Sequence, residues 1–159
     1  MKAVTVSILK NELRQHSQQE LIEICLKLAK FKKENKELLS YVLFDSNDED
    51  GYIRSIKEVI DEEFSKFNHE RLYFVKKSTR RTLRIIKKYV RYSKKKETET
   101  QVLLYFCEKM KQLPPTFKSS RQMINIYERQ LEIVKKAIET LHEDLQHDFN
   151  LELEELQKL

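Results

Sequence analysis

Basic residues are the part of this sequence whose type and spacing could do chemistry. Twelve lysines and arginines lie between Arg71 and Lys96, with no aspartate or glutamate among them. The other 19 basic residues (31 minus 12) face 26 acidic ones, so this segment supplies the net charge of +5. Like charges four residues apart on a helix repel each other, so an anionic partner should offset them. The candidate anion-binding residues are Lys76, Lys77, Arg80, Arg81, Arg84, Lys87, Lys88, Arg91, Lys94 and Lys95.

Two explanations of this basic helix, residues 71–96, stay open. Lysine and arginine clustered along a helix are typical of proteins that bind nucleic-acid phosphates. Alternatively, acidic stretches of the same protein, such as residues 45–50 and 61–63, could cover the helix. An anionic membrane surface is disfavoured, because the apolar side of the helix is needed for the core. Aromatic residues that could stack on bases, or belong to the core, are interleaved at Tyr73, Phe74, Tyr89 and Tyr92.

Other candidate sites fail on spacing. His142 and His147 are five residues apart, whereas a zinc-binding helix places two histidines four residues apart on one face. In the acidic loop that begins at Asp45, Asp50 and Ile56 occupy the sixth and twelfth positions, where a calcium loop needs glycine and glutamate. The single glycine, Gly51, excludes glycine-rich phosphate loops, and no local motif joins a nucleophile to a base. We therefore predict no metal, no cofactor and no enzymatic activity.

The elements that must position the basic residues are predicted to be helices. The chain has one glycine and two prolines and is rich in lysine, glutamate, leucine and glutamine, which favours helices joined by short polar loops. Apolar residues recur at spacings of three and four throughout the chain. We predict an all-α fold of one domain, residues 1–159, in which about seven helices form stacked helical hairpins. A short α-solenoid and an irregular bundle both fit this pattern.

Caps and apolar stripes place the individual helices. Ser17 and Glu20 match a capping box, in which each side chain accepts a hydrogen bond from the other residue's amide. The basic helix is expected to bury Leu83 and Ile86 on its inner side. Other helix starts are predicted at Asn35, Asn68, and Thr98 or Thr100. The fourth, fifth and last helices are expected at about residues 52–67, 69–94 and 120–149, with an acidic tail at 150–159.

The last helix carries a second candidate binding face. Its apolar residues follow each other at spacings of four and three for nearly three heptads, which is the pattern of a coiled-coil seam. A face of this kind could join two copies of the chain into a homodimer. The residues are Tyr127, Leu131, Val134, Ile138, Leu141 and Leu145.

Residues 7–44 carry a family resemblance. The stretches SILKNEL, QHSQQELIEICLKLA and KELLSYVLF resemble the opening of a family of uncharacterised, all-helical bacterial proteins, some of which are similar to HEAT-type helical-hairpin repeats. The resemblance implies a helical-hairpin fold and a bacterial origin. It implies no catalytic or binding residue.

Compartment and function follow from what the sequence lacks. No apolar run approaches the ~20 residues of a membrane span, and we expect no signal peptide. Cys25 and Cys107 lie in apolar helical patterns and are expected to be buried free thiols in a reducing cytoplasm. We predict a cytoplasmic, non-enzymatic interaction module that binds a protein partner or itself, with a nucleic-acid-binding protein as the alternative. An exposed basic face would favour nucleic acid, and one covered by carboxylates would favour the interaction module.

Overall fold

The structure is a computed structural model that describes residues 1–158. Helices make up 80% of the chain, and the described residues contain no strand, so the all-α prediction is confirmed. The chain divides into two compact units. Residues 1–44 form what we call the N-terminal unit, and the chain from Asp45 onward forms the C-terminal unit.

The N-terminal unit consists of short helices. These are α1 (Val6–Leu13), α2 (Gln18–Phe31) and α3 (Lys33–Ser40), after which a π-helical turn, η1 (Tyr41–Asp45), leads on along the chain. The predicted capping box is confirmed, because the Glu20 amide donates to Ser17 Oγ (3.3 Å) and the Ser17 amide donates to Glu20 Oε2 (2.7 Å). Asn35 is not a cap. It lies inside α3, and its side-chain amide donates to the Leu28 carbonyl at 2.8 Å.

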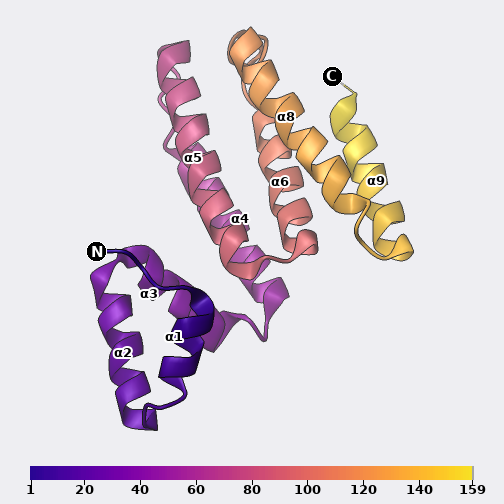
Figure 1. Cartoon of the computed structure of the whole chain (residues 1–159). Helices are drawn as coiled ribbons and strands as arrows, with labels where there is room; N and C mark the ends of the chain where they lie inside the picture. The colour runs from indigo at the N-terminus through magenta and orange to yellow at the C-terminus, as the bar shows by residue number, and fades with distance from the viewer. Residues whose placement is uncertain (159) are drawn as a thin grey trace. The chain divides into compact units, whose positions relative to one another are not determined.

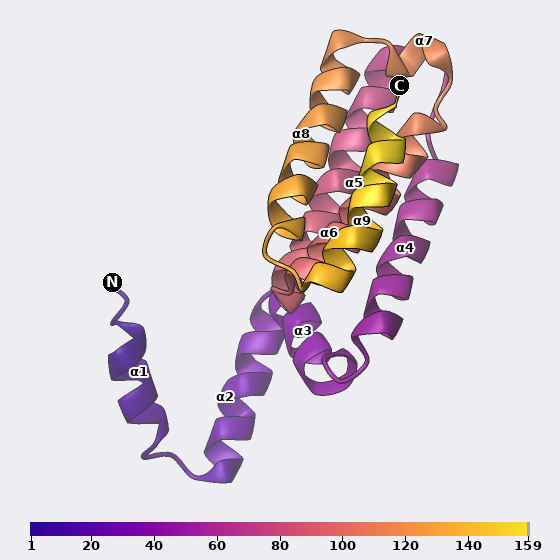
Figure 2. The same ribbon diagram turned by 90° about the vertical axis from the view of Figure 1, so that its right-hand side faces the viewer.

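The C-terminal unit is a layered bundle around α6 (Lys96–Lys111). Helix α6 packs against the four long helices α4 (Glu49–Ser65), α5 (Leu72–Ser93), α8 (Arg121–Ile138) and α9 (Glu143–Gln157) (Figure 1). The short α7 (Pro115–Lys118) lies at one end of the bundle (Figure 2). The core is built on α6, whose Val102, Leu103 and Phe106 are almost completely buried.

Two helices of this unit begin elsewhere than predicted. Helix α4 starts at Glu49 because Asp48 caps it, with Oδ1 accepting from the Gly51 amide at 3.0 Å. A Cβ atom on Gly51 would lie 2.2 Å from an Asp48 carboxylate oxygen, so the only glycine serves this cap and not a loop. Asn68 accepts from the Glu70 amide in a turn ahead of α5, which starts at residue 72 and not at 69.

The predicted start of the sixth helix is also wrong. Helix α6 begins at Lys96, and Thr98 and Thr100 are buried inside it. The hydroxyl of Thr100 donates to the carbonyl of Lys96 one turn earlier, which satisfies the buried group within the helix. Both threonines therefore belong to the core of the unit and neither caps the helix.

The single long helix predicted for residues 120–149 is two helices. Helix α8 ends at Ile138, and α9 starts at Glu143 with His142 as its N-cap, whose Nδ1 accepts from the Asp144 amide at 3.3 Å. The predicted acidic tail belongs to α9 as far as Gln157. Helix α9 packs through apolar residues, since Phe149, Leu153 and Leu156 are buried. Leu159, at the end of that tail, lies outside the described residues.

The predicted heptad face points into the chain's own core. Tyr127, Leu131, Val134 and Ile138 are buried, where α8 packs against α6 and α9. Leu141 and Leu145 are half-buried and lie beyond the end of α8. The coiled-coil spacing therefore reflects packing of α8 within one chain, where α6 and α9 cover this face.

Candidate nucleic-acid interface

Helix α5 separates an apolar face from a basic one. Its buried residues are Val75, Thr79, Thr82, Ile86 and Val90, at steps of four, three, four and four. Leu83, which was expected to be buried with Ile86, is only half-buried. Thr82 takes the inner position instead, and its hydroxyl donates to the Ser78 carbonyl at 3.0 Å, so burial leaves no unpaired donor.

The opposite face of α5 carries four exposed cations, which we call the basic stripe: Lys77, Arg80, Arg84 and Arg91. They follow each other at steps of three, four and seven, which keeps them on one side of the helix. Within the described chain, none of the four has a carboxylate within 4 Å. Lys94, exposed just after the helix, is its C-cap and adopts a left-handed conformation (φ 59°).

Three other residues of the basic helix are matched by carboxylates of the same unit. Arg81 Nε lies 3.6 Å from Glu63, Lys95 Nζ lies 3.0 Å from Glu49, and Lys96 Nζ lies 2.6 Å from Glu99. Glu49 also accepts a hydrogen bond from the Thr98 hydroxyl, so it joins the start of α4 to the start of α6. Carboxylates therefore neutralise part of the basic helix, at its C-terminal end and along the edge that faces α4.

Lys76 and Lys87 lie on the edge of α5 that faces α8. Lys76 donates to the side chain of Gln122. Burial lowers the pKa of the half-buried Lys87, and the positive charge of Arg129 lowers it further, whereas Glu99 raises it. Two cations from different helices thus lie close enough to repel, an arrangement that a bound anion would relieve.

Arg129 is the member of this cluster that sequence reasoning missed. The heptad spacing assigned the core residues of α8, and Arg129 lies off that seam. In the sequence, Arg129 is only a basic residue next to the apolar heptad positions of α8. Its contribution to the positive surface follows from its position near Lys87 of α5.

The aromatic residues of α5 split into two pairs. Tyr73 is exposed one turn before Lys77, and its ring meets that of Phe74 edge-on at 5.5 Å. Tyr89 and Tyr92 are half-buried and contact each other edge-on at 6.1 Å. Lys88 Nζ lies 5.0 Å from the Tyr89 ring centroid, a cation–π distance. Tyr73 is thus an exposed ring at the N-terminal end of the basic stripe.

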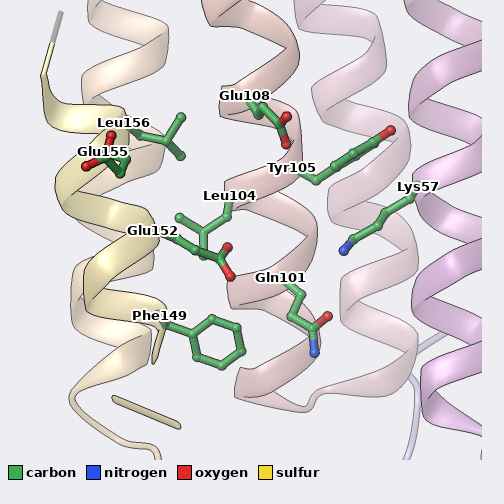
Figure 3. A pocket seen from close by; sticks show the side chains of 9 residues that line it. All are labelled: Lys57, Gln101, Leu104, Tyr105, Glu108, Phe149, Glu152, Glu155 and Leu156. Atoms are coloured by element: carbon green, nitrogen blue, oxygen red, sulfur yellow. The ribbon is translucent and has the colours of Figure 1, made fainter. Parts of the chain in front are cut away.

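A groove of about 490 Å³ lies between α4, α6 and α9, and three of the four charged residues that line it are glutamates. Glu108 and Glu152 extend toward the space that Lys57 faces, whereas Glu155 lies at the outer edge of α9 (Figure 3), where its carboxylate is 2.8 Å from Lys158 Nζ. Carboxylates repel phosphate, so this groove does not suit a nucleic-acid backbone. The C-terminal unit is therefore polarised, with an acidic groove and a separate basic stripe.

The described residues offer little to other kinds of site. No group of three or more His, Cys, Asp or Glu side chains among them could hold a metal ion. Burial raises the pKa of the Cys107 thiol to about 12, so Cys107 is not a thiolate nucleophile at neutral pH. Cys25 is exposed, contrary to the sequence prediction. Among the described helices, none combines the length and the apolarity needed to cross a bilayer.

Comparison with family models, with curated proteins and with solved structures finds no match to this chain. The family resemblance of residues 7–44 therefore stays a prediction. Function has to be argued from the surfaces of the protein itself.

Proposed function

We propose that this protein is a non-catalytic binding module whose basic stripe contacts the phosphate backbone of nucleic acid. The observation that carries the proposal is the exposure of Lys77, Arg80, Arg84 and Arg91 on one face of α5, with no carboxylate within ion-pair distance in the described chain. A surface of like charges is costly to maintain alone and is relieved by an anionic polymer. Lys87 and Arg129 extend the positive surface toward α8.

The length of the basic stripe suits a nucleic-acid backbone. Lys77 and Arg91 are 14 residues apart, which is about 21 Å along an α-helix. This distance equals roughly six base-pair steps of duplex DNA. Flexible lysine and arginine side chains on such a row contact phosphates and give affinity without reading sequence.

The competing proposal is an interaction module in which charge matching within the protein, or between copies, offsets the basic helix. Its support is the three ion pairs of Arg81, Lys95 and Lys96. These pairs leave the basic stripe unmatched, which is why we favour nucleic acid. A stack of helical hairpins, which the sequence predicts, would also support nucleic-acid binding, since such stacks offer extended surfaces to long ligands.

The test is removal of the basic stripe. The variant with Lys77, Arg80, Arg84 and Arg91 all changed to Gln should lose most of its affinity for a mixed-sequence duplex of about 20 base pairs. Binding of the parent should weaken steeply between ~50 mM and ~200 mM salt. In a plot of log affinity against log salt concentration, the slope of the variant should be smaller in magnitude by about three to four units. Fluorescence anisotropy titrations would measure both.

A matched control removes four exposed cations from the N-terminal unit by changing Lys2, Lys10, Arg14 and Lys36 to Gln. Both variants lower the net charge from +5 to +1 (5 − 4). The control variant should keep most of the affinity, because its charges lie outside the basic stripe. Equal losses in the two variants would show attraction by net charge alone. A parent that does not bind at ~50 mM salt would end the proposal.

A further inference from the structure

Tyr73 is an exposed aromatic residue in a unit that otherwise covers most of its large apolar side chains. Among the described residues of the C-terminal unit, the exposed large hydrophobic side chains are Tyr73, Phe74 and Leu151. Two of these three are consecutive aromatic residues in the first turn of α5. Tyr73 is the most exposed of the three, at 60%, so much of its side chain is open to a ligand.

Tyr73 lies in line with the basic stripe. It precedes Lys77 by four residues and Arg80 by seven, spacings that return to the same side of an α-helix. Helical geometry places Tyr73 and the four cations of the stripe within an arc of about 60°. One turn, about 6 Å along the helix axis, separates Tyr73 from Lys77. A ligand that follows the basic stripe to its N-terminal end therefore reaches the Tyr73 side chain.

Phe74 contacts the Tyr73 ring without covering both of its faces. The two ring centroids are 5.5 Å apart and the ring planes meet at 72°, which is an edge-to-face arrangement. Such a contact leaves at least one face of the Tyr73 ring free of Phe74. The other aromatic pair of α5, Tyr89 and Tyr92, is half-buried and offers less ring surface.

An aromatic face beside a row of cations suits a single nucleic-acid strand. In a duplex, each base is paired and stacked between its neighbours, so a side chain cannot stack on it. In a single strand, an unpaired base can stack on an aromatic ring while lysine and arginine contact the phosphates. This stacking tolerates any base sequence, because every base has a π face.

We propose that the preferred ligand of the basic stripe is single-stranded nucleic acid, with one base stacked on the Tyr73 ring. Lys77, Arg80, Arg84 and Arg91 bind the phosphates beyond that base. The inference rests on the proposed function, because it names the ligand of the same surface. The cations hold the phosphates of any strand, and Tyr73 is the residue that distinguishes an unpaired base from a paired one.

The experiment compares an oligothymidylate of about 12 nucleotides with a duplex of about 12 base pairs at equal salt concentration. The parent should bind the single strand more tightly than the duplex. Tyr73→Ala should weaken binding of the strand at least fivefold, because the base loses its stacking partner, and change binding of the duplex less than twofold. Tyr73→Phe should bind like the parent, because stacking uses the ring and not the hydroxyl.

Two controls separate stacking from other effects. The salt dependence of strand binding should be the same in Tyr73→Ala as in the parent, because this variant loses no charge. Phe31→Ala removes an aromatic side chain that is 80% exposed but belongs to the N-terminal unit. It should bind strand and duplex like the parent. Circular dichroism would confirm that each variant keeps its helices.

A second measurement reports on stacking itself. The chain has no tryptophan, so Tyr73→Trp introduces the only indole. Its fluorescence should be quenched by the single strand, on which a base stacks, and much less by the duplex. Phe31→Trp is the matched control, and its fluorescence should change with neither ligand.

Failure of this inference can be told apart from failure of the proposed function. A parent that binds neither ligand at ~50 mM salt would overturn both. A parent that binds the strand no more tightly than the duplex, with Tyr73→Ala equal to the parent, would overturn the inference and leave the proposed function standing. A loss in Tyr73→Ala that strand and duplex share equally would also overturn it, because Tyr73 would then support the fold and not strand recognition.

Discussion

The N-terminal and C-terminal units use the same kind of amphipathic helix and bury it to different extents. In the C-terminal unit, α6 alone has eight buried residues, including two threonines whose hydroxyls are hydrogen-bonded. In the N-terminal unit, α1, α2 and α3 have none. Of the 17 large hydrophobic side chains exposed in the described chain, 14 belong to residues 1–44. An apolar stripe thus predicts a helix, but it does not show how much of that stripe the chain itself will bury.

Ion pairs show the same contrast. In the N-terminal unit, the ion pairs join residues four apart in sequence, as between Lys33 and Glu37 (3.7 Å). In the C-terminal unit, they also join different helices, as between Lys109 of α6 and Asp61 of α4 (2.7 Å). Local pairs stabilise single helices by a few tenths of a kcal/mol. Pairs between helices hold a tertiary arrangement, so the C-terminal unit has a fixed packing of its own.

Leucine-to-alanine variants should show the largest difference between the two units, measured as the loss of unfolding free energy. Leu103→Ala removes a fully buried side chain from α6 and should cost about 2–5 kcal/mol of unfolding free energy. Leu83→Ala, at a half-buried position in α5, should cost less than Leu103→Ala. Leu28→Ala, in α2, should cost less than about 0.5 kcal/mol in dilute protein, because its side chain is 56% exposed. Urea unfolding would give all three values.

Features set by neighbouring residues were predictable from the sequence. The capping box of Ser17 and Glu20 depends on two residues three positions apart, and it forms as predicted. The basic face of α5 follows from helical period alone. The break between α8 and α9 was missed, because neither glycine nor proline marks it and the leucine spacing runs on through Leu141 and Leu145.

Features that need two helices in contact were not predictable. Arg129 joins the positive surface only because α8 lies beside α5. Positions 82 and 83 both fit a helical stripe. Packing against neighbouring helices determines that Thr82, and not Leu83, faces the core. Which basic residues keep their charges unmatched also depends on where Glu63, Glu49 and Glu99 fall in the bundle.

A smaller effect should come from the bond that ties α9 to α8. The Tyr127 hydroxyl donates to the Leu156 carbonyl at 2.6 Å, in a buried position. Tyr127→Phe should cost about 1 kcal/mol, because the carbonyl loses its partner without gaining water. Tyr73→Phe is the matched control, since the Tyr73 side chain is exposed, and it should change the unfolding free energy by less than 0.5 kcal/mol. Equal values for the two variants would show that α9 is not held by this bond.

The smallest effect should come from Asp61, and it should depend on pH. The Tyr105 hydroxyl lies 2.7 and 2.8 Å from the two Asp61 carboxylate oxygens, and Lys109 Nζ lies 2.7 Å from one of them. Partial burial alone would raise the pKa of Asp61, but Lys109 and then Tyr105 outweigh it and hold the pKa below its ordinary value of 3.8. A lowered carboxyl pKa contributes stability above the ordinary value, and this is lost as pH falls through the folded-state pKa.

Asp61→Asn should therefore cost under about 1 kcal/mol at neutral pH, because the carboxylate is 47% exposed and screened by water. The difference from the parent should shrink below about pH 4, since the parent carboxyl is then becoming neutral in the unfolded chain and next in the folded one. Lys33→Gln, which removes a local pair of the N-terminal unit, should change stability by a few tenths of a kcal/mol at most. Urea unfolding of the three proteins at several pH values checks both statements. A difference between parent and Asp61→Asn that stays constant with pH would mean that lost packing, and not lost charge, explains the variant.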